Sequence, residues 1–127
     1  VYSKSCPLFV PLAEEGWVQG DVPIQVAKAY LDTLMIHNID TLVLGCTHYP
    51  LLNDTIQQVM GKDVTLVDSA KETARVVEET LSAMQQLASP QELPIHEYLV
   101  SDDPVRFNII GTRFLGSPVE PVEWVDI

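Results

Sequence analysis

Positive charge, cysteine and long apolar runs are all scarce in this sequence. Seven Lys and Arg residues stand against 18 Asp and Glu residues, which gives a formal net charge of −11. Such a surface repels phosphate backbones, so we expect no nucleic-acid partner. No apolar run approaches the roughly 20 residues that span a bilayer. No basic segment precedes an apolar stretch either, so we expect neither a membrane span nor a secretory signal.

The only two cysteines, Cys6 and Cys46, also limit the chemistry. They are too few for a disulfide scaffold, and their spacing does not match common zinc sites. Reduced thiols in a cytoplasmic protein fit this usage best. Cys6 precedes a proline in an irregular segment, and we interpret it as a buried structural thiol.

The length of 127 residues fits one domain, and 46% apolar residues are enough to build a core. The first residue is Val rather than Met, so we expect a piece of a longer chain. CPLFVPLAEEGW at the start has two prolines within an apolar run, which predicts a loop with one short turn of helix. A helix follows over residues 22–37, with Asp21 as its cap and Pro23 in its first turn.

Two short apolar runs predict strands that are buried on both faces, as in a parallel sheet. The first is Thr41 to Leu44, and the second is VTLVD at residues 64–68. Between them, LLNDTIQQVM at residues 51–60 reads as a helix. Ser69–Glu72 has the pattern of a capping box that opens a helix to about residue 87. This alternation indicates an α/β fold with a parallel sheet.

The last third of the sequence has weaker periodicity. HEYLV at residues 96–100 predicts a strand, and Ser101 to Pro104 predicts the start of a helix that ends at Gly116. VEWVDI at residues 122–127 alternates as a terminal strand.

The feature with the clearest chemical meaning is the turn after the first predicted strand. Ligands of open α/β sheets bind beyond the carboxyl ends of strands, where Gly45 and Cys46 lie. Gly45 permits a close backbone approach or an unusual dihedral. The N-terminus of the following helix would stabilise a thiolate at Cys46 and a substrate carboxylate held beside the Thr47 hydroxyl. His48 is near enough to exchange protons.

Simpler interpretations compete with this one. A lone cysteine at a strand end is commonly a small apolar core residue. Cys46 and His48 could also belong to a metal site, although only Asp68 offers a further ligand nearby. We interpret Asp68 and Ser69 as a strand end and a helix cap.

Other titratable residues read as structural. Glu14 and Glu15 would ordinarily be a solvated pair of carboxylates. His37 at a helix end would compensate the helix dipole. His96 has no partner that the sequence identifies.

Four blocks of the sequence, in order, resemble bacterial glutamate racemases of the aspartate/glutamate racemase superfamily. LVLGCTHYPLL resembles their second cysteine motif, and CPLFVPLAEEG and VDSAKETARVV resemble the segments on either side of it. FLGSPVEPVEWVDI resembles the C-terminal end of the family. The resemblance implies interconversion of L- and D-glutamate for peptidoglycan synthesis, without pyridoxal phosphate, metal or any other cofactor.

The resemblance also implies the residue roles. Family members invert the α-carbon with two opposed cysteines, one removing a proton and one delivering a proton to the other face. Inversion through a planar carbanion requires a base on one side and an acid on the other. Cys46 matches the second catalytic cysteine, Thr47 the substrate-binding residue beside it, and His48 the assisting histidine. Glu15 is the better match to an assisting glutamate, and Glu14 is the alternative. A Cys6–Cys46 disulfide is disfavoured because it would disable the thiolate.

The block that carries the first catalytic cysteine of the family is not in this sequence. The resemblance implies a parallel-sheet, three-layer half-structure from a two-domain fold. Residues 1–68 would be the C-terminal part of the second domain, and residues 69–127 would be a crossover helix and a segment that returns to the first domain. We therefore expect the chain alone to be inactive, and to associate with the missing N-terminal half or with itself as a homodimer.

Two alternatives stay open at this point. One is a related racemase or decarboxylase that acts on aspartate, hydantoins or arylmalonates, although histidine after threonine in GCTH favours glutamate. The other is a non-catalytic binding module that keeps the fold.

Overall fold

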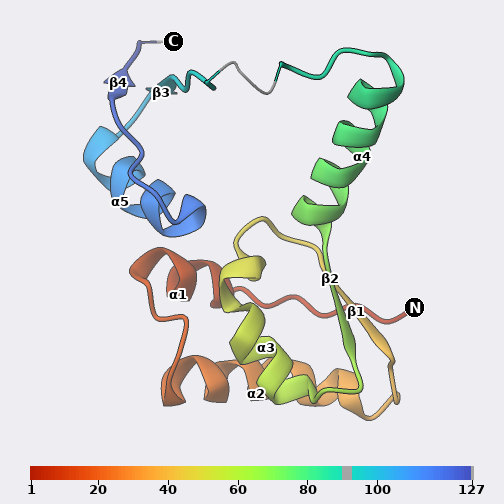
Figure 1. The fold of residues 1–127 in the computed structure, drawn as a ribbon. Coiled ribbons are helices and arrows are strands. Elements are labelled where there is room, and N and C mark those ends of the chain that lie inside the picture. Colours follow the sequence, from red (N-terminus) through yellow and green to blue (C-terminus); the bar gives the residue numbers. More distant parts are fainter. Residues whose placement is uncertain (90–92, 127) are drawn as a thin grey trace. The chain divides into compact units, whose positions relative to one another are not determined.

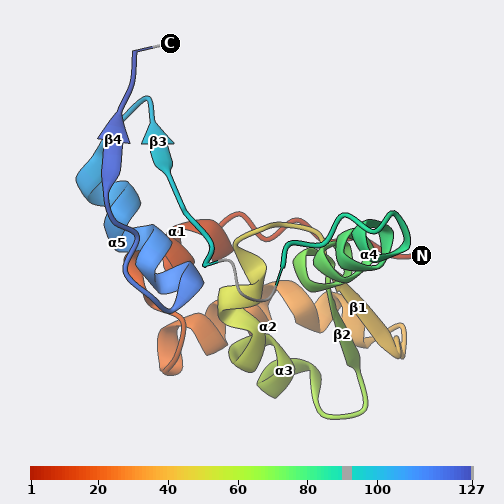
Figure 2. The ribbon, with the colours of Figure 1, turned by 45° about the horizontal axis from the view of Figure 1, so that its top comes forward.

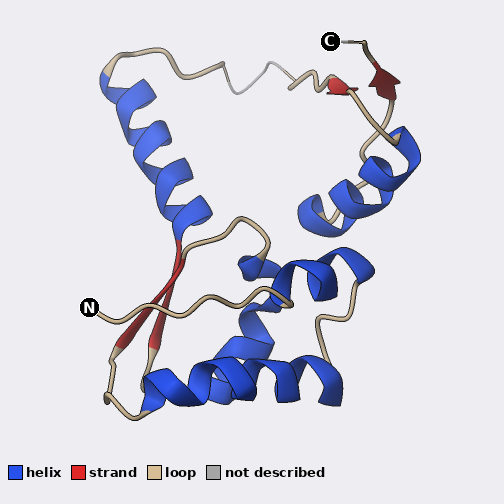
Figure 3. Cartoon of the chain, turned by 180° about the vertical axis from the view of Figure 1, so that it is seen from behind, coloured by secondary structure: helices blue, strands red, loops and turns tan. Residues whose placement is uncertain are grey.

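A computed structural model describes residues 1–89 and 93–126 of the chain. Its contacts divide the chain into two compact units, Val1–Leu87 and Ala88–Ile127. Each unit contains a two-stranded parallel sheet accompanied by helices (Figure 3). The α/β fold class predicted from the sequence is thus confirmed. The expected division near residue 68 refers to the two domains of a longer fold and stays a prediction.

Helices dominate the first unit (Figure 1). In chain order they are α1 (Phe9–Glu15), α2 (Asp21–Met35), the single 3-10 turn η1 (Tyr49–Leu52), α3 (Asn53–Met60) and α4 (Ser69–Ala83). The helix predicted over residues 22–37 is confirmed as α2, which packs against α3. Its N-cap residue is Gly20 rather than the expected Asp21, which is already the first helical residue.

Helix α1 is longer than the single turn that the sequence predicts. Pro11 is the third residue of α1, and there its missing N–H removes no helical hydrogen bond. The second proline of the segment, Pro7, lies before the helix. Pro7 therefore lies ahead of the helix, and Pro11 is accommodated within its first turn.

The sheet of the first unit consists of β1 (Thr41–Leu44) and β2 (Thr65–Asp68), paired in parallel from Thr41↔Thr65 to Leu44↔Asp68. Both predicted strands are confirmed. The expected burial on both faces is wrong for β1, since Leu44 is 2% exposed whereas Val43 is 61% exposed. Successive side chains point to opposite faces of a strand, so one face packs on the helices and the other is open.

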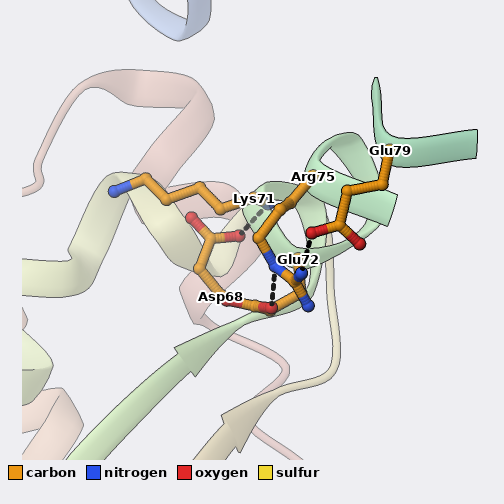
Figure 4. Close-up of polar contacts among 5 residues, drawn as sticks. All are labelled: Asp68, Lys71, Glu72, Arg75 and Glu79. Atoms are coloured by element: carbon orange, nitrogen blue, oxygen red, sulfur yellow. Dashed lines mark hydrogen bonds and ion pairs between the residues drawn. The ribbon is translucent and has the colours of Figure 1, made fainter. Parts of the chain in front are cut away.

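Helix α4 begins at a cap that differs from the predicted one. The Asp68 carboxylate accepts hydrogen bonds from the backbone N–H groups of Ala70 (2.9 Å) and Lys71 (3.3 Å). Figure 4 shows the contact with Lys71. Asp68 is therefore the N-cap residue, and the capping box proposed for Ser69–Glu72 is wrong. The helix ends at Ala83, before the predicted residue 87.

Exposed ion pairs line one side of α4. The Arg75 guanidinium lies 3.2 Å from the Glu72 carboxylate and 2.6 Å from that of Glu79 (Figure 4). All three side chains are more than half exposed, so solvent screens these pairs and they add little stability.

One buried apolar cluster joins the N-terminal segment, α1, α2, β1, η1 and α3. Its members are Cys6, Phe9, Ala27, Leu31, Leu34, Leu44, Leu52, Ile56, Val59 and Met60. Thr55 is buried beside them, and its hydroxyl donates to the Val18 carbonyl at 2.6 Å. The cluster holds α2 and α3 under the sheet and fixes the end of β1.

The second unit contains β3 (Tyr98–Val100), α5 (Pro104–Leu115) and β4 (Val122–Trp124), as Figure 2 shows. The predicted strands and helix are confirmed, although Ile127 of the terminal strand lies outside the described residues. The Asp103 carboxylate caps α5, and Gly116 ends it with a left-handed φ of 67°. Among the described residues, no helix is long and apolar enough to cross a membrane.

The buried cluster predicts a large difference between two isoleucines. Ile56 is 1% exposed, and Ile36 is 75% exposed. Ile56→Ala leaves a cavity and should lower the free energy of unfolding by about 2–5 kcal/mol. Ile36→Ala should change it by less than about 0.5 kcal/mol. Urea denaturation of both variants measures the two values, and equal losses would contradict this packing.

Candidate active site

The turn that carries Cys46 is anchored at both ends by buried leucines. Leu44 precedes it at 2% exposure, and Leu52 follows it at 0% exposure. Within the turn, Tyr49 N–H donates to the Cys46 carbonyl (3.2 Å) and Leu51 N–H donates to the His48 carbonyl (3.2 Å). The short segment between the two leucines therefore has a defined conformation next to the sheet.

The helix after this turn differs from the predicted one. The α-helix expected from residue 51 begins at Asn53, and the 3-10 turn η1 precedes it. Gly45 has no positive φ, and a Cβ there would meet no atom within 4 Å. Among the described residues, neither an unusual dihedral nor a close backbone approach therefore requires a glycine at this position. Gly45 instead lies beside open space.

Three polar side chains form a chain of contacts next to Cys46. His48 Nε2 lies 3.4 Å from Glu14 Oε1, and His48 Nδ1 lies 3.4 Å from Thr47 Oγ1. The contact between α1 and η1 brings Glu14 to the turn. The imidazole thus has a carboxylate on one nitrogen and a hydroxyl on the other, an arrangement that orients a histidine for proton transfer.

The two neighbouring glutamates differ in position. The Glu14 side chain contacts His48 and is 28% exposed. Glu15 is an exposed residue at the end of α1. The geometry thus favours Glu14, although the sequence resemblance favours Glu15.

Cys46 itself is partly buried, and it is a free thiol, as is Cys6. Thr47 is exposed and His48 is partly buried. The turn therefore presents a thiol, a hydroxyl and an imidazole on consecutive residues. These groups can accept or donate a proton and hold an anionic ligand by hydrogen bonds.

Tyr49 links this turn to the N-terminal segment. Its hydroxyl donates to the Cys6 carbonyl at 3.3 Å, and its ring packs edge-on against Phe9 at 5.2 Å between centroids. Burial raises the pKa of the Tyr49 phenol, and the nearby Cys6 and Cys46 thiols raise it further. The phenol therefore stays neutral and keeps donating. Sequence reasoning missed this role, although Tyr49 stands within the recognised motif.

Cys6 is 3% exposed in the core, as predicted. Burial raises the pKa of its thiol, with a smaller opposing effect of Lys4. A raised thiol pKa keeps the group protonated at neutral pH, so Cys6 is poorly suited to act as a thiolate base.

The end of β2 supports the same turn. Asp68 pairs with Leu44 across the sheet, and the Ser69 hydroxyl donates to the Leu44 carbonyl at 3.1 Å. The predicted strand-end role is confirmed for Asp68, which is also the helix cap, while Ser69 instead binds the neighbouring strand. Within residues 1–89 and 93–126, no three His, Cys, Asp or Glu side chains are grouped to hold a metal ion.

The two remaining histidines stack on tyrosines. The His37 ring lies 3.7 Å from the Tyr2 ring between centroids, and α2 ends before it. His96 stacks on Tyr98 at 6.2 Å, so it has a partner that the sequence did not identify.

Comparison with known proteins finds relatives that resemble this chain in sequence and in structure. No protein-family model matches the chain. The glutamate racemase of Geobacter metallireducens is 49% identical over 127 residues, which cover 100% of this chain and 47% of that protein. The crystal structure of glutamate racemase from Francisella tularensis in complex with D-glutamate matches with a TM-score of 0.87 and 35% identity, over 99% of this chain and 47% of that one. The crystal structure of the Thermus thermophilus glutamate racemase in complex with β-chloro-D-alanine matches with a TM-score of 0.87 and 40% identity. This match covers 98% of this chain and 47% of that one.

By fold, the chain is an α/β protein of the aspartate/glutamate racemase type. More particularly, it is a homologue of glutamate racemases and corresponds to their C-terminal half. The chain spans about half the length of the curated relatives that it matches.

Proposed function

We propose that the chain supplies one of the two acid–base thiols of a glutamate racemase. Cys46 Sγ, as a thiolate, takes the α-proton of one glutamate enantiomer, and the electron pair stays on the planar α-carbon. A thiol on the opposite face then gives its proton to that carbon, which inverts the centre without oxidation or reduction. In the reverse direction, the protonated Cys46 delivers the proton.

The contacts around the turn support this proposal. His48 follows Cys46 by two residues and lies between the Glu14 carboxylate and the Thr47 hydroxyl. A histidine held in this way can exchange a proton with a thiol close to it in the same turn. The exposed Thr47 hydroxyl would bind a substrate carboxylate, which gives an acidic protein a local donor for an acidic ligand.

The substrate is proposed from the relatives. The matched Francisella tularensis racemase holds D-glutamate, and the curated relatives are named glutamate racemases. The product would be D-glutamate for peptidoglycan synthesis in the cytoplasm. Aspartate is the alternative substrate within the same class.

The chain alone should not complete this reaction. Its second thiol, Cys6, is buried in the core and protonated, so it is not available as the opposing acid or base. The opposing thiol would come from the part of the fold that this chain does not span, which is about half of the relatives' length.

The first prediction compares the two cysteines in a full-length protein. This protein joins the chain to the N-terminal half of the Geobacter metallireducens racemase. Cys46→Ala should lower kcat for racemisation by about 10³-fold or more, because one face of the carbanion loses its acid or base. Cys6→Ala is the matched control and should keep kcat within about threefold. Circular dichroism of the racemisation gives both rates, and unchanged racemisation by Cys46→Ala would remove this thiol from the mechanism.

A second prediction separates the two glutamates. In the same protein, Glu14→Gln should lower kcat by on the order of tenfold or more, because His48 loses the carboxylate that orients it. Glu15→Gln should leave kcat unchanged. The opposite result for the two variants would assign the assisting role to Glu15.

A further inference from the structure

Two tyrosine hydroxyls hold the chain where it enters α1. The Tyr30 hydroxyl of α2 accepts a hydrogen bond from the Leu8 N–H at 3.4 Å. The Tyr49 hydroxyl of η1 donates to the Cys6 carbonyl at 3.3 Å. Leu8 is the N-cap residue of α1, and Cys6 lies two residues before it. The start of this helix is therefore tied to α2 on one side and to η1 on the other.

The ring of Phe9, the first residue of α1, packs against both tyrosines. It lies edge-on to Tyr49 at 5.2 Å and to Tyr30 at 5.7 Å between centroids, an arrangement that aromatic rings prefer. Phe9 is 1% exposed, and its backbone N–H donates at 3.0 Å to the Cys6 carbonyl that Tyr49 also binds. The first residue of the helix is thus fixed by its side chain and by its backbone.

The two hydroxyl contacts differ in their access to water. Leu8 is an exposed residue, so water can replace the Tyr30 hydroxyl as the acceptor for its N–H. The Cys6 carbonyl belongs to a residue that is 3% exposed, and its contact with Tyr49 is partly buried. A buried acceptor that loses a donor is not readily compensated by water. The start of α1 therefore depends more on Tyr49 than on Tyr30.

Tyr49 also belongs to the turn that carries the candidate site. It directly follows His48, and its N–H donates to the Cys46 carbonyl at 3.2 Å. Its backbone is therefore part of the turn, while its hydroxyl supports α1. In the last turn of α1, the Glu14 carboxylate lies 3.4 Å from His48 Nε2. One residue thus connects the imidazole to the helix that brings its carboxylate.

We propose that Tyr49 is a positioning residue, whose hydroxyl keeps α1 in the orientation from which Glu14 reaches His48. A helix of only seven residues turns as one body, so a change at its start alters the direction of the Glu14 side chain. The contact of 3.4 Å is already long for a charge-assisted hydrogen bond, so a small displacement breaks it. Tyr49 acts through these two residues rather than on the substrate.

The inference rests on the proposed function only for its effect on the rate. The contact between Glu14 and His48 exists without a substrate, so it can be observed in the 127-residue chain itself. Failure of the positioning role and failure of the racemase role are therefore separate results.

The imidazole of His48 reports the contact directly. Tyr49→Phe keeps the ring against Phe9 and the backbone bond to Cys46, and it removes only the hydroxyl. In long-range 1H–15N NMR spectra of the chain, it should shift the His48 Nε2 signal in the same direction as Glu14→Gln does. An unchanged His48 signal in Tyr49→Phe would overturn the proposal, whether or not glutamate is racemised.

Tyr30→Phe is the matched control, because it removes a hydroxyl from the other tyrosine that packs on Phe9. It should leave the His48 signal in place, and an equal shift in this variant would also overturn the proposal. The signal of His37, which stacks on Tyr2 in the same unit, should stay unchanged in all variants and show that the unit is folded.

A double-mutant cycle separates positioning from a general loss of stability. The protein is the full-length one that joins the chain to the N-terminal half of the Geobacter metallireducens racemase. Tyr49→Phe should lower kcat by about five- to tenfold and keep KM within about twofold, because the substrate contacts remain. In a protein that already carries Glu14→Gln, it should lower kcat by less than about twofold, since the contact it supports is gone.

The same kinetics give the contradicting result. Tyr30→Phe should keep kcat and KM within about twofold of the unchanged protein, because water replaces its hydroxyl. Losses in kcat that multiply between Tyr49→Phe and Glu14→Gln would show that Tyr49 acts independently of Glu14, and the proposal would be wrong. A full-length protein that does not racemise glutamate would count against the proposed function, and the His48 signal would then decide the positioning role.

Discussion

The burial of Leu44 and Leu52 on either side of the Cys46 turn is the constraint on which the candidate site depends. Both leucines belong to the cluster that holds α2 and α3 together, so the turn between them cannot move freely. The same packing brings η1 against α1 and places Glu14 beside His48. The core therefore positions the Glu14 carboxylate, which is distant in the sequence, together with the imidazole and the thiol of the turn. Preorganisation of this kind lets weak side-chain acids and bases act on a weakly acidic α-proton.

Much of this arrangement could be predicted from the sequence, because the two strands of the first unit are short unbroken apolar runs. β1 and the cap of α5 are where the pattern indicates, and GCTHYP identifies the turn. The extent of α1 could not be predicted, since Pro11 usually signals a break and its position within the first helical turn is not visible in the sequence. The choice between Glu14 and Glu15 depends on the rotation of that helix against η1, which is a tertiary property. The sequence does not distinguish Ser69 from Asp68 as the cap of α4, because both have side chains that can cap a helix.

The edge of β1 that is not paired with β2 and the proposed absence of an opposing thiol would have the same physical origin. A chain that spans about half the length of its relatives contains strands whose neighbours can lie in the remaining half, and we propose that the thiol opposite Cys46 lies there as well. The exposed Val43 is consistent with this, because a β-branched apolar residue in a parallel strand is normally covered. The same second half would thus supply both the missing strand neighbours and the opposing thiol.

We propose that Cys46 is one of two opposed acid–base groups and that the other is not in this chain. The most direct test is exchange of the glutamate α-proton for deuterium in D2O, followed by NMR together with the optical rotation. We expect no racemisation by the purified 127-residue chain, and racemisation with deuterium incorporation by the full-length protein that contains it. Robust racemisation by the chain alone would show that no second half is needed.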